Sequence, residues 1–253
     1  PLRFKGFVKR RNFSIPIEIE CEGYSYQLRK KSFTKSYRST TVRQVLTDLI
    51  DGTDIKLHPK MPEVPIGAVF FRNVNGLKVL EYFKDKCLLT CYFDFDLLYV
   101  GIEQGVLKDT VKHQLGWNVI KDSDLRFEEK KEFADVQIHI EKKQNTGHRK
   151  KAIYGPKDGS IKVYKVDLID DEETLKALAE QKKKELQYKG YEGKIKTFLF
   201  PVIEPGMASQ IISTQYPERT GTYFIETVSG DMGPEGGRQE GERGKGKEGG
   251  IGY

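Results

Sequence analysis

The chain has 253 residues, 37% of them hydrophobic and 32% charged, and a formal net charge of +6 at pH 7. This composition is typical of a folded globular protein and excludes a mainly disordered chain. No apolar run approaches the ~20 residues that a membrane-spanning helix requires, so we predict no membrane segment. The cysteines lack CxxC spacing and lie among apolar residues, which favours buried free thiols at Cys21, Cys87 and Cys91.

Alternating side chains predict strands near the start of the chain. Ile17, Ile19 and Cys21 alternate with glutamates at positions 18, 20 and 22. A period of two places one set of side chains on a core and the other set in water. We therefore interpret residues 3–39 as β structure that contains a half-buried strand.

A small α+β unit is predicted over residues 40–103. Thr41 and Gln44 form a capping box in front of an apolar stripe, and Gly52 is placed to end the resulting helix. The other elements expected in this unit are a strand, a second helix and a hairpin that turns at Asp94 and Asp96, over residues 66–71, 76–87 and 88–100.

Strands dominate the region from residue 104 onward. The strands are predicted over residues 112–120, 136–142, 149–154, 161–168, 191–200, 208–215 and 222–229. One helix, over residues 171–189, has acidic residues at its start and lysines towards its end, which complements the helix dipole. We expect a β-barrel with this helix packed on its outside. The glycine-rich, charged segment from Gly230 is expected to be flexible.

No pattern in the sequence points to an enzyme. Asp94 and Asp96 are interpreted as turn residues, and the acids at 170–173 as helix-capping residues. The glycine-rich segment 155–160 lacks the Gly-Lys-[Ser/Thr] core of a phosphate loop, so we interpret it as a hairpin turn. The histidines lack metal-site spacing and are His58, His113, His139 and His148. We assign no catalytic, cofactor-binding or metal-binding residue, and we expect no cofactor.

The order of motifs in the last third of the chain resembles the last barrel of bacteriophage baseplate hub proteins. In order, these motifs are a helix, a GYxG strand at 190–193, a turn at Pro205 and Gly206, a YPER-x-G-x-Y hairpin at 216–223 and a glycine-rich exit. The amino-terminal part of type VI secretion spike proteins is related to these hubs. Other segments resemble the end of the first hub barrel and its connecting unit, namely residues 4–8, 15–22, 26–29, 40–49, 76–87 and 98–101.

The resemblance implies an α+β, mainly β fold with tail-hub-like β-barrel domains and a small α/β connecting domain. Residues 1–39 would be an incomplete first barrel, which should expose apolar surface or unpaired strand edges. Residues 40–103 would be the connecting domain. Residues 104–253 would be the second barrel with an outer helix at 171–189 and a flexible tail.

The resemblance also implies a structural role in the tail of a phage or a phage-like particle. Three subunits would form a homotrimeric ring that joins the tail tube to the baseplate spike, with the tube and spike proteins as partners. The protein would be located in the baseplate of the virion tail, after assembly in the cytoplasm of the bacterial host. The family carries no catalytic residues.

A nucleic-acid-binding β-barrel module is the alternative hypothesis, because small barrels bind single strands through basic grooves and stacked aromatic residues. The 43 lysines and arginines are, however, interleaved with 37 acids along most of the chain. The aromatic residues fall mainly in alternating positions that suit a core, and no recognition motif is present. We therefore expect no specific nucleic-acid partner.

Overall fold

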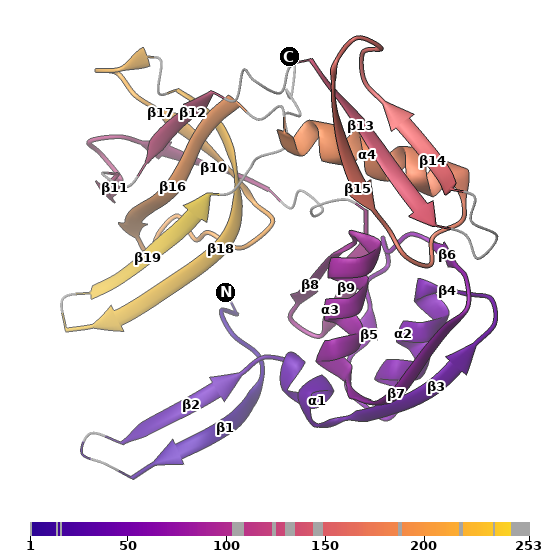
Figure 1. The fold of residues 1–253 in the computed structure, drawn as a ribbon. Helices are drawn as coiled ribbons and strands as arrows, with labels where there is room; N and C mark the ends of the chain where they lie inside the picture. Colours follow the sequence, from indigo (N-terminus) through magenta and orange to yellow (C-terminus); the bar gives the residue numbers. More distant parts are fainter. Residues whose placement is uncertain are drawn as a thin grey trace. The chain divides into compact units, whose positions relative to one another are not determined.

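The computed structural model describes residues 2–13, 15, 17–102, 109–122, 125–129, 135–143, 149–186, 189–217, 220–234 and 236–243. These residues are mainly β with interspersed helices, as the predicted α+β fold class requires (Figure 1). Their contacts divide the chain into two compact units. The first unit comprises residues 1–104, 138–154 and 161–180, and the second comprises residues 105–137, 155–160 and 181–253. Among the described residues, no helix is long and apolar enough to cross a membrane.

The first unit begins with an antiparallel hairpin of β1 (Phe7–Asn12) and β2 (Glu18–Glu22). A short helix, α1 (Ser25–Lys30), follows it, so the prediction of β structure throughout residues 3–39 is wrong at this point. Tertiary contact explains the helix. Leu28 is fully buried, and a Cβ atom on Gly76 would lie only 2.9 Å from the Leu28 carbonyl oxygen.

The predicted helices of the connecting region are confirmed. The helix α2 (Val42–Ile50) begins after Thr41, whose hydroxyl accepts a hydrogen bond from the Gln44 amide at 3.2 Å. The helix α3 (Gly76–Cys87) begins after Asn75, whose side chain accepts from the Lys78 amide at 3.0 Å. The buried side of α2 consists of Val42, Val45, Leu46 and Leu49.

Short strands surround these helices. The strand β3 (Ser32–Tyr37) pairs with β7 (Val69–Asn75), and β4 (Thr40–Thr41) pairs with β6 (Pro65–Ile66). The predicted hairpin is formed by β8 (Thr90–Asp94) and β9 (Leu97–Gly101). The strand β5 (Lys56–Leu57) joins β9 in parallel.

A three-stranded sheet contains β13 (Val136–Lys143), β14 (Arg149–Tyr154) and β15 (Ser160–Lys165). Its strand order is β14-β13-β15, so β14 and β15 lie on opposite sides of β13. Residues 155–160 therefore connect strands that are not neighbours, and the prediction of a hairpin turn there is wrong.

Most of this sheet and the first half of α4 (Glu172–Leu186) belong to the first unit. The prediction that residues 104–253 form one barrel with this helix on its outside is wrong in this respect. Backbone hydrogen bonds of 2.7 Å explain the division: the Asp167 amide donates to the Lys86 carbonyl, and the Gly67 amide donates to the Leu168 carbonyl. These bonds hold the segment before α4 against the connecting region.

The second unit is built on a seven-stranded sheet with the order β10-β17-β18-β19-β16-β11, and β12 pairs with β16 beside this path. The strands are β10 (Thr110–Gln114), β11 (Val119–Lys121), β12 (Arg126–Glu129), β16 (Lys189–Phe198), β17 (Ala208–Ile212), β18 (Gly221–Gly233) and β19 (Gly236–Arg243). The hub-protein resemblance predicts a hairpin around residues 216–223. The antiparallel pairing of β17 with β18 confirms it.

Two local predictions for this unit are wrong. The segment expected to be flexible from Gly230 contains β19, which pairs with both β18 and β16; residues 244–253 of the same prediction lie outside the described part of the chain. The strand expected over residues 112–120 is interrupted by a turn that carries Trp117. Trp117 is 79% exposed, although its position in the predicted strand suited a core.

Candidate assembly surfaces

The acidic residues considered for chemistry serve local structure. Asp94 and Asp96 flank the turn between β8 and β9, as predicted. The Asp96 carboxylate lies 3.3 Å from the Lys5 ammonium, and its own backbone amide, followed by Lys5, holds the pKa of Asp96 below its usual value. Asp171 accepts hydrogen bonds from the amide and hydroxyl of Thr174 at 2.8 and 2.7 Å, which lower its pKa. This is the predicted capping role at the start of α4.

The described histidines lie in different parts of the fold. His58 packs edge-on against Tyr99 at 5.8 Å. His113 is buried in the seven-stranded sheet, with its Nδ1 2.6 Å from the Ser209 hydroxyl oxygen. His139 is buried on β13, and burial lowers its pKa. His148 lies outside the described residues. Within the described ranges, no group of three or more His, Cys, Asp or Glu side chains is arranged to hold a metal ion.

The cysteines follow the predicted burial at two of three positions. Cys87 is buried and Cys91 is half-buried, and burial raises the pKa of each thiol to about 12. Cys21 is exposed on β2, so the prediction that it is buried is wrong. The prediction of a half-buried strand is also wrong here, because Glu18, Ile19, Glu20 and Cys21 are all exposed. The side chains of β2 alternate between two faces, but no described part of the chain covers the apolar one.

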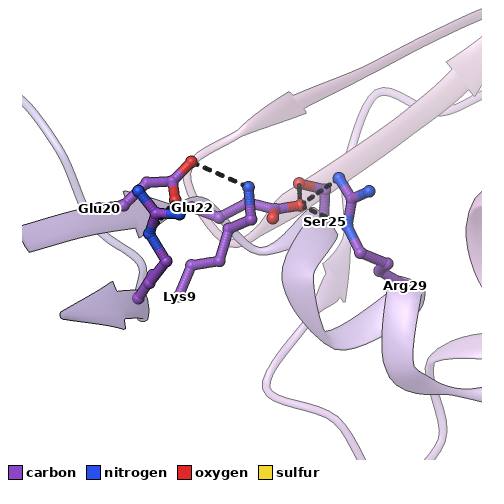
Figure 2. Close-up of polar contacts among 6 residues, drawn as sticks. Lys9, Glu20, Glu22, Ser25 and Arg29 are labelled. Atoms are coloured by element: carbon purple, nitrogen blue, oxygen red, sulfur yellow. Dashed lines mark hydrogen bonds and ion pairs between the residues drawn. The ribbon is translucent and has the colours of Figure 1, made fainter. Parts of the chain in front are cut away.

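The hairpin β1–β2 carries an ion-pair face, which we define by Glu18, Glu20 and Glu22 and their partners. The Lys9 ammonium donates to Glu20 at 3.0 Å, and the Arg29 guanidinium donates to Glu22 at 2.8 Å (Figure 2). These hydrogen bonds from Lys9 and Arg29 lower the pKa values of Glu20 and Glu22, respectively. The ion-pair face is therefore internally satisfied and suited to water.

The opposite face of the hairpin, which we call the apolar face, carries Val8, Ile17, Ile19 and Cys21, together with Arg11, which pairs with Ile19. Val8 pairs with Cys21 across the hairpin. Val8, Ile17 and Ile19 are 43%, 67% and 60% exposed. The exposed apolar surface expected at this end of the chain is therefore present. Clustered exposed apolar side chains on a sheet mark an interaction surface or an aggregation site.

The edges of the hairpin add backbone groups to this surface. In the described part of the chain, β1 and β2 form a two-stranded sheet and pair only with each other. Each strand therefore presents one edge of amide and carbonyl groups to the surroundings. Such edges are templates for pairing with a further strand. The apolar face and the two edges together form a candidate assembly surface.

Solved structures with the same fold come from phage tails and a related secretion system. The chain aligns over 97% of its length with 80% of a tail protein from Neisseria meningitidis MC58, with a TM-score of 0.64 and 14% identity. The chain has the fold of phage tail proteins. It aligns over 90% of its length with 73% of the 43 kDa tail protein of prophage MuSo2 from Shewanella oneidensis, with a TM-score of 0.59 and 12% identity.

A third similar structure is an E. coli component of the type VI secretion system that is itself similar in structure to bacteriophage T4 tail proteins. The alignment covers 92% of this chain and 56% of that protein, with a TM-score of 0.54 and 11% identity. No protein-family model and no curated protein matches the sequence. The likeness to tail hub proteins that the sequence motifs indicate is thus confirmed at the level of the fold.

Proposed function

We propose that this chain is a structural component of a phage or phage-like tail, where it belongs to a hub ring that connects the tail tube to the baseplate spike. The observation that carries the proposal is the shared fold over 97% of the chain with a tail protein. The protein acts by assembly and not by catalysis. Its partners are the tube and spike proteins, and its location is the baseplate of the virion tail.

In this proposal the parts of the chain have distinct roles. Residues 1–39 supply the last strands of a first barrel, residues 40–103 form the connecting domain, and the seven-stranded sheet forms the second barrel. The hairpin β1–β2 supports this division, because its apolar face and its edges are suited to contact with further strands.

The proposed ring is a homotrimer whose subunits meet head to tail. Contacts between two different surfaces of the same chain generate closed rings when the rotation between neighbours closes. We expect the chain to self-associate, with a mass that rises with concentration towards three times the 29.0 kDa of one chain. Multi-angle light scattering over a range of concentrations tests this, and negative-stain imaging tests ring closure. A strictly monomeric chain at the highest concentration would contradict an intrinsic trimer.

We expect DNA binding to be weak and nonspecific, because many of the basic side chains pair with acids and few counterions would be released. The Lys142 ammonium lies 2.6 Å from Asp170, and Lys194 lies 3.6 Å from Glu240. Fluorescence anisotropy with labelled oligonucleotides measures the DNA affinity. A salt concentration of ~150 mM screens the charges to the physiological degree. Tight binding that discriminates between sequences would instead support the alternative hypothesis of a nucleic-acid-binding barrel.

A further inference from the structure

Two turns of the second unit meet at one edge of the seven-stranded sheet. The strands β10 and β17 pair in parallel, with Gln114 opposite Ile212, and the Leu115 amide continues the ladder with a 2.9 Å hydrogen bond to the Ile212 carbonyl. Because parallel strands end at the same edge, the segments that follow them leave the sheet side by side. A groove of about 530 Å³ lies between these segments. Its lining includes Gln114, Trp117, Asp122, Ser213, Gln215 and Tyr216.

The turn that carries Trp117 is held by its neighbours. The Asn118 side chain accepts from the Gln114 amide at 2.8 Å and donates to the Lys112 carbonyl at 3.1 Å. The Trp117 amide donates to the Gln114 carbonyl at 3.1 Å. Gly116 has a φ of +80°, a conformation that glycine adopts at low cost. The backbone that presents the indole ring is therefore fixed before any ligand arrives.

The turn that carries Tyr216 is fixed in a similar way. The Tyr216 amide donates to the Ser213 hydroxyl at 3.0 Å, and the Ser213 amide donates to the Thr220 hydroxyl at 3.2 Å. The Thr220 amide donates in turn to the Pro217 carbonyl at 3.0 Å. Trp117 and Tyr216 are 79% and 53% exposed, respectively. Two large aromatic side chains thus stand at a groove on preorganised turns, which lowers the entropic cost of binding.

The remaining lining groups define the chemistry of a ligand. Gln114 and Gln215 each offer an amide that can donate and accept, and Asp122 offers a carboxylate. No lysine or arginine is among the described residues that line the groove. The described lining thus supplies no basic side chain for a phosphate, which favours a neutral ligand over a nucleic acid. A protein anchor would normally fill a more apolar pocket whose centre is depleted of charge.

We propose that this groove binds a neutral oligosaccharide. A sugar ring presents an apolar C–H face, which suits the flat faces of Trp117 and Tyr216, and a rim of hydroxyl groups, which suits the amides and the carboxylate. The volume lies within the range of small-ligand sites. This proposal goes beyond the tail-assembly role and is tested separately from it.

The chain offers a direct reporter, because Trp117 is its only tryptophan. We would titrate the full chain with maltotriose, cellotriose and tri-N-acetylchitotriose and follow the tryptophan emission. A saturable change with at least one sugar is expected, with a Kd of about 1 mM or tighter. A response confined to tri-N-acetylchitotriose assigns the site to N-acetylated glycans, and a response to either of the other sugars assigns it to neutral hexose chains.

Matched variants test the position of the site. Tyr216→Ala is expected to weaken binding about tenfold, which is a modest loss for one stacked ring. Gln215→Ala, at an exposed position of the same turn, is a second groove variant and should also weaken binding. Phe200→Ala is the control, because Phe200 is a 69% exposed aromatic residue of the same unit that does not line the groove. The Phe200→Ala variant should bind the sugar with the same affinity as the unchanged chain. Circular dichroism confirms that each variant is folded.

Three results would overturn the proposal. They are the absence of a saturable change with all three sugars, an equal loss of affinity in Phe200→Ala, and a saturable response to oligothymidylate in place of the sugars. Failure of the sugar titration leaves the light-scattering test of ring formation unaffected, so the two proposals are separately falsifiable.

Discussion

Replacing Gln239 with alanine is expected to lower the free energy of unfolding by about 3 kcal/mol. Gln239 is fully buried on β19, and its side chain forms hydrogen bonds with the backbone of the segment that follows β16. Its amide nitrogen donates to the Phe198 carbonyl at 2.8 Å and to the Pro201 carbonyl at 2.6 Å, and its oxygen accepts from the Ile203 amide at 3.2 Å. The alanine variant leaves these backbone groups without their partner.

The expected magnitude follows from the surroundings of those groups. A buried polar group left unsatisfied costs about 1–3 kcal/mol. Phe198 is 45% exposed, so water can reach part of this segment, whereas Ile203 is fully buried and its amide is harder to hydrate. The loss should therefore be less than the sum of three full penalties. Ile203 also packs with Val111 and Ile225, so loosening the segment weakens this core.

Urea denaturation followed by circular dichroism measures the change in unfolding free energy. Gln215→Ala is the control, because Gln215 is an exposed glutamine in the same unit and its loss should stay within about 0.5 kcal/mol. An unfolding free energy of Gln239→Ala that matches the control would show that the segment after β16 does not depend on the buried amide.

Replacing Ile17 and Ile19 with glutamate is expected to abolish self-association. These two side chains carry the apolar face of the β1–β2 hairpin and are 67% and 60% exposed. Burying an isoleucine side chain contributes about 1.5–3 kcal/mol, so two per contact contribute about 3–6 kcal/mol. A loss of this size weakens association by more than about a hundredfold. The buried glutamates would add a desolvation penalty.

The stability of the single chain should change little in this double variant, because neither side chain is part of a described core. Light scattering measures the association, and urea denaturation measures the stability. Glu18→Gln, on the ion-pair face of the same hairpin, is the matched control and should associate like the unchanged chain. Association that survives in the double variant would exclude the apolar face from the contact between subunits.

Elements with strong local signals are predicted correctly from the sequence. The start of α2 depends on Thr41 and Gln44, which are three residues apart, and the bounds of α3 follow from its apolar stripe. The hairpin between β8 and β9 depends on a short turn at Asp94 and Asp96. The fold class follows from the order of such elements. Each of these features depends on neighbours in the chain, so the pattern alone is sufficient.

The candidate surfaces are only partly visible in the sequence. The alternation of Ile17 and Ile19 with glutamates reveals the two faces of a strand, but not that the apolar face stays exposed. The groove has no sequence signal of its own. Trp117 lies in a stretch that predicts a strand, and the turn around it is stabilised by the Asn118 side chain.

The sequence by itself determined the helices α2 and α3, the β8–β9 and β17–β18 hairpins and the amphipathic character of β2, because local hydrogen bonds and side-chain periodicity specify them. The tertiary structure alone decided that α1 is helical, that β13, β14 and β15 belong mainly with the first unit, and that β10 lies parallel to β17. These features depend on contacts between distant residues, such as the one between Leu28 and Gly76 and the hydrogen bonds at Gly67 and Lys86. Strands that pair across a long stretch of chain carry no local mark of their partner, since the alternation that defines a strand is the same whichever neighbour it joins.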